Sequence, residues 1–140
     1  MTFSSEILVA NQLRNYLIEE NWWIFQLISP GGQAHFSFSF NIQEKRKTIF
    51  PDLIAYKDSL VLFGEIKPKF DEKDKEKLLE IDNSDEAKNV LRKVLARRLN
   101  GLSTTFQIVP VLIHGDDNAE KHPLIDQIVI SESVRYLRKG

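Results

Sequence analysis

Hydrophobic and polar positions repeat along the chain with two different periods. Residues 5–20 carry apolar side chains at the three-to-four-residue spacing of an amphipathic helix. Residues 35–42, HFSFSFNI, alternate strictly, which predicts a strand with one buried and one solvated face. Residues 22–30 indicate another strand, ended by Pro30 and the pair Gly31-Gly32. The chain therefore begins with a helix followed by strands.

Helical and extended patterns alternate through the remaining residues. The stretch LVLFGEI is apolar on both faces, as expected of an interior strand in a covered sheet. Pro110 implies that its strand is an edge strand or carries a bulge. The order predicts an α/β or α+β sandwich; we expect an α/β fold with a mixed central sheet flanked by helices. The predicted elements are a charged connection at 43–48, strands at 49–56 and 60–67 around a turn at 57–59, an exposed helix at 71–82, a helix at 84–99, strands at 106–115 and 125–132, and a short helix at 132–138.

Composition narrows the class of protein. A chain of 140 residues is expected to form one domain, 1–140, and 42% hydrophobic residues argue against disorder. The formal net charge of −1 excludes a uniformly polybasic protein but allows local basic patches. The chain has no cysteine, which excludes disulfides and thiolate metal sites. Because we find neither a signal-peptide pattern nor an apolar run of about 18 residues, we expect a cytoplasmic protein without a membrane partner.

Three charged residues lie on strands that are otherwise built for burial: Asp52, Glu65 and Lys67. Glu65 and Lys67 share one face of their strand because they are two residues apart. A two-residue turn at Asp58-Ser59 would oppose residues whose numbers sum to 117, which places Asp52 across from Glu65. A turn that makes the paired residue numbers sum to 115 would also keep Asp52 on that face. A three-residue turn without a bulge would instead place Asp52 on the opposite face. The sequence therefore permits Asp52 to share a face with Glu65 and Lys67 but does not require it.

Two carboxylates at that separation repel each other unless a cation lies between them. A hard divalent ion such as Mg²⁺ takes oxygen ligands of this kind, and the Ile66 carbonyl could add another. Lys67 could then hold a phosphate oxygen or help to orient and deprotonate a metal-bound water. A Glu-x-Lys sequence is also common as a solvated strand end. The adjoining Pro51-Asp52 and the tight hairpin favour the metal site.

Glu6 is a further candidate in the first helix. At about 100° per residue it points along the apolar stripe, together with Ala10, Leu13 and Leu17. A glutamate in a first helical turn is also explained by the helix dipole alone. Both interpretations of Glu6 stay open.

The pair Pro51-Asp52, followed by Glu65-Ile66-Lys67 after a helix with a glutamate, resembles the PD-(D/E)XK nuclease superfamily. The resemblance covers about residues 1–70 and implies the restriction-endonuclease-like fold. It also implies that Asp52 and Glu65 bind Mg²⁺, with Mn²⁺ as a possible substitute, that Lys67 assists the attacking water, and that Glu6 is the helix glutamate. The products would carry 5′-phosphate and 3′-hydroxyl ends. The long charged stretch after Lys67 departs from the pattern and leaves the substrate open.

Basic residues outside the hairpin could contact phosphates without reading sequence. The resemblance, together with these residues, implies a Mg²⁺-dependent DNA endonuclease of the restriction, defence or mobile-element type. It would act as a homodimer, since cutting two strands requires two sites. A Holliday-junction resolvase and a catalytically silent DNA-binding or assembly module of the same fold are the alternatives. The candidate DNA-binding residues are Lys45, Arg46, Lys47, Lys69, Arg92, Lys93 and Arg97.

Overall fold

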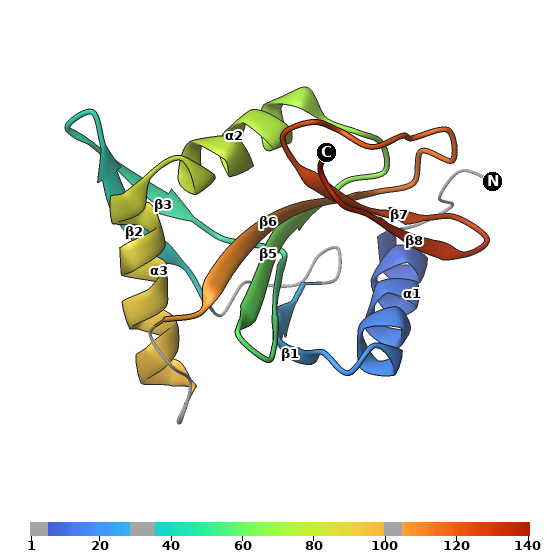
Figure 1. Cartoon of the computed structure of the whole chain (residues 1–140), viewed down its shortest axis with the longest axis horizontal. Helices are drawn as coiled ribbons and strands as arrows, with labels where there is room; N and C mark the ends of the chain where they lie inside the picture. Colours follow the sequence, from blue (N-terminus) through green and yellow to red (C-terminus); the bar gives the residue numbers. More distant parts are fainter. Residues whose placement is uncertain (1–5, 29–35, 100–104) are drawn as a thin grey trace.

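A six-stranded mixed sheet forms the centre of the computed structural model, with helices on both of its faces (Figure 1). The structure describes residues 6–28, 36–99 and 105–140, and the side chains of residues 6 and 7 lie outside this description. The elements in chain order are α1 (Glu6–Glu19), β1 (Trp23–Leu27), β2 (Phe38–Ile42), β3 (Lys45–Ile49), β4 (Leu53–Lys57), β5 (Leu60–Ile66), α2 (Glu72–Asp82), α3 (Asp85–Arg98), β6 (Gln107–His114), β7 (Asp126–Ile130) and β8 (Val134–Leu137).

The order of strands in the central sheet is β1-β4-β5-β6-β7-β8. β5, β6 and β7 are parallel to one another, whereas β1, β4 and β8 each pair antiparallel with their neighbours. The predicted α/β class, with a mixed sheet flanked by helices, is confirmed. β5 lies inside the sheet, which explains why LVLFGEI is apolar on both faces.

One face of the sheet is covered by α1. Val9, Leu13 and Leu17 are fully buried on this helix and pack against sheet residues that include Leu53 and Leu62. These helix positions follow the spacing of an amphipathic stripe, so the predicted first helix is confirmed. None of the described helices is long and apolar enough to cross a membrane.

The other face is covered by α2, α3 and a two-stranded sheet made of β2 and β3, and we call it the α2 face (Figure 1). Ile54 and Phe63 of the central sheet pack here against Leu78 of α2 and Leu91 of α3. Residues of β4 and β5 that alternate with Leu53 and Leu62 therefore point to the α2 face.

Five local predictions differ from the structure. The predicted connection at 43–48 contains β3, because Gln43 and Glu44 have positive φ angles of 50° and 66° and form a tight turn back to β2. The predicted strand at 49–56 begins only at Leu53, since Ile49 pairs with β2. The remaining differences concern the 71–82 and 132–138 segments and Pro110.

The predicted helix at 132–138 is instead strand β8, which pairs with β7. The helix predicted at 71–82 exists as α2, but it is not wholly exposed, because Leu78 and Ile81 are buried. Pro110 lies in an interior strand, yet the pairing with β7 begins only at Val111, so Pro110 has a strand neighbour on one side alone. The loss of its N–H is tolerated there.

Candidate active site

The turn between β4 and β5 sets the geometry of the predicted site. The paired residues run from Lys57 and Leu60 to Leu53 and Gly64, so each pair sums to 117. This register needs a two-residue turn at Asp58-Ser59, and Asp58 has the positive φ of 54° that such turns require. The two-residue turn is confirmed, and the three-residue alternative is excluded.

One step beyond the paired residues, Asp52 lies across from Glu65. The Asp52 N–H donates to the Gly64 carbonyl at 3.0 Å, and the Ile66 N–H donates to Asp52 Oδ2 at 2.9 Å. Both contacts tie Asp52 to the end of β5. Asp52 alternates with Leu53, and Glu65 with Gly64, so both carboxylates point to the α2 face.

Glu65 is a buried carboxyl group, with a side chain only 7% exposed. Burial raises the pKa of Glu65 from its ordinary 4.5 to about 7, because the charged form loses its hydration. A hydrogen bond from Lys77 acts in the opposite direction, whereas a hydrogen bond with Asp52 and its negative charge raise the pKa further. The two carboxyl groups are therefore close enough to influence each other.

Lys67 follows β5 and is held by a carboxylate of α2. Its Nζ lies 3.6 Å from Asp74 Oδ2, and its N–H donates to the Ile113 carbonyl at 2.8 Å. The negative charge of Asp74 raises the pKa of Lys67 above its ordinary value, with smaller increases from Asp71 and Glu65. Lys67 thus stays protonated at neutral pH on the same side as Glu65.

Two residues of α2 that the sequence analysis missed complete the set of charges. Lys77 Nζ donates to Glu65 Oε1 at 2.8 Å, and Asp74 faces Lys67. Asp74 Oδ2 is buried and has no hydrogen-bond partner among the described residues. Asp74 and Lys77 are three residues apart and so share a helix face. Helix α2 thereby presents a charge of opposite sign to Glu65 of β5 and another to Lys67, which follows the strand.

Gln26 fixes the backbone that leads into Asp52. Its Nε2 donates to the Pro51 carbonyl at 2.7 Å, while the Phe36 N–H donates to its Oε1 at 2.9 Å. The Ile28 N–H donates to the Asp52 carbonyl at 2.9 Å. Gln26 is itself buried, so these bonds are formed away from water. The aspartate is therefore positioned by β5 on one side and by β1 and Ile28 on the other.

Gly64, directly before Glu65, allows β5 and β6 to approach closely. A Cβ atom at this position would lie 2.5 Å from the Val111 carbonyl oxygen and 2.8 Å from Val111 Cγ1. Such distances are not compatible with a side chain unless the strands move apart. Gly64 thus lets the end of β5 that carries Glu65 lie close against β6 in the centre of the sheet.

The donor set suits a hard divalent cation. Two carboxylates from adjacent strands point to one face, and their mutual repulsion would be relieved by a positive ion. Among the described residues no group of three or more histidine, aspartate or glutamate side chains converges. An ion bound here would use Asp52 and Glu65 and complete its coordination with other oxygens, as Mg²⁺ commonly does. The Ile66 carbonyl stays a predicted ligand, and Glu6 stays a prediction because its side chain lies outside the described residues.

The predicted DNA-binding residues do not share one environment. Lys47 forms an ion pair with Glu80 of α2, and the Arg92 Nε donates to the Phe106 carbonyl at 3.1 Å. These two basic residues therefore have structural partners. The other five are exposed on β3, on the segment after β5 and on α3: Lys45, Arg46, Lys69, Lys93 and Arg97.

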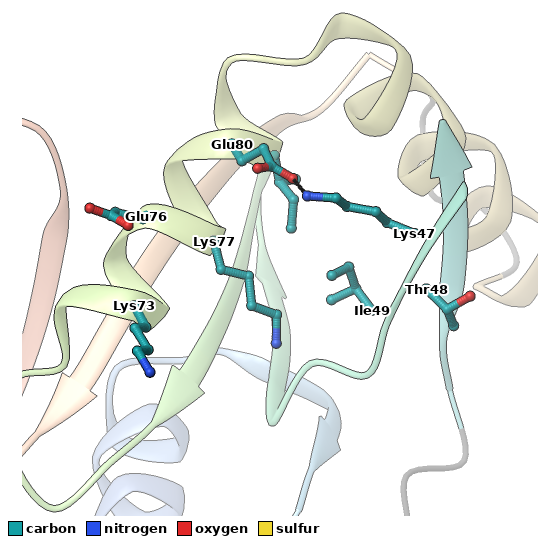
Figure 2. Close-up of a pocket in the computed structure, with 8 residues that line it drawn as sticks. Lys47, Thr48, Ile49, Lys73, Glu76, Lys77 and Glu80 are labelled. Atoms are coloured by element: carbon teal, nitrogen blue, oxygen red, sulfur yellow. Dashed lines mark hydrogen bonds and ion pairs between the residues drawn. The ribbon is translucent and has the colours of Figure 1, made fainter. Parts of the chain in front are cut away.

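A groove of about 440 Å³ lies between β3 and α2. Figure 2 shows Lys73 and Lys77 leaving the same side of α2, and the Lys47–Glu80 pair joining β3 to the helix. Ile49 and Ile81 form its apolar part. Because Lys77 both lines the groove and contacts Glu65, the groove and the carboxylate pair share a residue.

Comparisons with protein-family models, with curated proteins and with solved structures gave no match to this chain.

Proposed function

We propose that this chain is a metal-dependent DNA endonuclease of the restriction-endonuclease-like fold. The observation that carries the proposal is the register of β4 and β5, which places Asp52 across from Glu65 on the α2 face. Lys67 lies two residues beyond Glu65 and on the same side. The helix, the hairpin and the parallel strand β6 beside β5 also agree with the order of elements in that fold.

Asp52 and Glu65 are the residues that would hold Mg²⁺ or Mn²⁺. A bound ion of this kind polarises a phosphoryl oxygen and makes a bound water more acidic. The contribution of the protein is to keep both carboxylates on one side of the sheet and to keep Glu65 away from bulk water. The Ile66 N–H orients Asp52 by donating to Oδ2, so the other oxygen of that carboxylate is the one available to a ligand.

Lys67 would contribute a positive charge. Its pKa is raised by Asp74, so a proton stays on the ammonium group at neutral pH. A charged lysine stabilises the negative charge that develops on a phosphate during cleavage. Of the two roles considered for Lys67, the direction of this pKa favours binding of a phosphate oxygen over removal of a proton from water.

The test is a cleavage assay with the full chain in Mg²⁺, in Mn²⁺ and in EDTA. We expect Asp52→Asn and Lys67→Ala each to lower the cleavage rate by about 100-fold or more, because each removes a group that acts on the reacting phosphate. Matched controls are Asp85→Asn and Lys121→Ala, which make the same changes at exposed positions far from β5 in sequence. Their rates should equal that of the unchanged chain.

The substrates should include a linear duplex and a four-way junction. Cleavage of the duplex supports the endonuclease, whereas cleavage of the junction alone supports the resolvase. The Lys77–Glu65 contact would favour the silent module, because an ion pair can hold the two elements together without catalysis. The absence of metal-dependent cleavage of either DNA by the unchanged chain would reject the nuclease proposal.

A further inference from the structure

Lys77 is the cation that the described structure places against Glu65. Its Nζ lies 2.8 Å from Glu65 Oε1, and the glutamate side chain is 7% exposed while that of the lysine is 40% exposed. The ammonium group therefore reaches from solvent to a buried oxygen. Hydrogen bonds between charged groups are stronger than neutral ones, particularly where water is excluded.

We propose that Lys77 is a positioning residue that competes with the divalent cation for Glu65 and thereby sets the metal affinity of the site. This inference depends on the proposed function only in taking Asp52 and Glu65 as metal ligands. An ion coordinated at Glu65 Oε1 would lie about 2 Å from that oxygen. An ammonium group already within hydrogen-bond distance of Oε1 would repel the ion and occupy part of the same space.

The groove beside α2 gives the displaced side chain a place to move. Lys77 lines the groove and its side chain is 40% exposed, so the ammonium group can swing from Glu65 into the groove while the neighbouring Leu78 stays buried in the core. Glu80 lies one turn further on, lines the same groove and already accepts from Lys47 (Figure 2). It offers Lys77 a second carboxylate at the i,i+3 spacing of neighbouring helix residues.

Lys73 provides a matched control for the contact. It lies one turn before Lys77, leaves α2 on the same side and lines the same groove (Figure 2). Lys73 is exposed and has no ion pair with any residue in the described ranges. Its replacement changes the net charge as much as replacement of Lys77 does, but it leaves the Glu65 contact intact.

The experiment measures Mn²⁺ dissociation constants at pH 8.5 and constant ionic strength, by calorimetry or by the electron paramagnetic resonance of free Mn²⁺. We expect Lys77→Gln to bind Mn²⁺ about tenfold more tightly, since the ion no longer displaces a charged hydrogen bond. Lys73→Gln should stay within about twofold of the unchanged chain, because exposed charges are screened. Lys77→Arg should restore the weaker binding.

Circular dichroism and melting curves check that each variant folds. If Lys77→Gln does not fold, Lys77→Met, which keeps the aliphatic stem of the side chain, takes its place. Adding Asp52→Asn must abolish the tight binding, and Mn²⁺ binding that survives it would overturn the inference. Equal affinities in Lys77→Gln and the unchanged chain would overturn the inference but not the proposed function. If Lys73→Gln and Lys77→Gln bind Mn²⁺ more tightly to the same extent, the inference would again be overturned and the proposed function would not. If no chain binds Mn²⁺, both proposals fail.

Discussion

Replacement of Glu65 by glutamine is expected to stabilise the protein at neutral and alkaline pH. Glutamine has nearly the shape of the protonated glutamate and carries no charge to desolvate. The pKa of Glu65 is raised to about 7, mainly by burial, so the ionised form is the unfavourable one in the folded state. The variant removes this cost while it also removes a predicted metal ligand.

The magnitude follows from the pKa difference between the folded and unfolded chains. Between pH 4.5 and about 7 the folded protein retains a proton that the unfolded chain releases, so the stability of the unchanged protein falls as pH rises through this window. One pKa unit corresponds to about 1.4 kcal/mol, so the loss approaches about 3 kcal/mol above pH 8 and is below about 1 kcal/mol at pH 5. For a domain of this size that is a rise of about 10 °C in the melting temperature of the variant at pH 8.

The assay is urea or thermal unfolding from pH 5 to pH 9 in the presence of EDTA, so that no bound ion contributes. The unchanged chain and Glu65→Gln should differ little at pH 5 and diverge toward pH 8. Glu76→Gln is the control, since Glu76 is an exposed glutamate on α2 and its loss should leave the pH profile unchanged. Parallel profiles for the unchanged chain and Glu65→Gln would refute the argument that burial makes the carboxylate costly.

Two further substitutions test how the site is supported. Gly64→Ala should lower the free energy of unfolding by about 1–3 kcal/mol, because its Cβ would lie 2.5 Å from the Val111 carbonyl oxygen; urea unfolding measures this. Gln26→Ala should cost about 2 kcal/mol or more, because the buried Pro51 carbonyl and Phe36 N–H lose their partner. Faster hydrogen exchange at the Phe36 N–H would accompany the second change.

Exposed positions supply the controls for these two substitutions. Gly140→Ala adds a methyl group where nothing lies within 4 Å, and Gln107→Ala removes an exposed glutamine from β6. Both should leave the urea midpoint unchanged. If Gly64→Ala were as stable as Gly140→Ala, the close approach of β5 and β6 would not be the reason for the glycine.

The carboxylate pair could be predicted from the sequence because it depends on local rules. Strand alternation decides which side chains share a face, and turn length decides which residues oppose each other. Asp52 and Glu65 are joined by one short hairpin, and Asp58 tolerates the positive φ of its turn. Only the choice among turn lengths had to come from the structure.

Strands β3 and β8 could not be predicted because their own residues give weak signals. KRKT carries charges at nearly every position, and its extended form depends on pairing with β2. The segment that contains β8 has only four paired residues, too few to separate a period of 2 from one of 3.6. In both cases the pairing of strands outweighs local propensity.

Lys77 and Asp74 could not be recognised for a related reason. Both lie in a run of alternating charges that reads as a solvated helix face, and their importance comes from the packing of α2 onto the sheet. One sequence feature could have indicated the contact. An acid and a base lie at i,i+3 spacing in this run, and an acid and a base lie two residues apart at the end of the preceding strand. Such spacings are too frequent to be specific.

The charged groups that the described structure brings together at the candidate site come from one continuous stretch between Asp52 and Lys77, but the strand β6 beside Glu65 does not. Glu65 lies beside Leu112 of β6, which joins the sheet from a distant part of the chain. Contacts between distant segments are slow to form, because the chain between them has to close into a loop first. A synthetic fragment of residues 50–80 would contain these charged groups and still have an ordinary, hydrated glutamate. The buried environment of Glu65 would form only when the C-terminal half of the chain packs against the fragment.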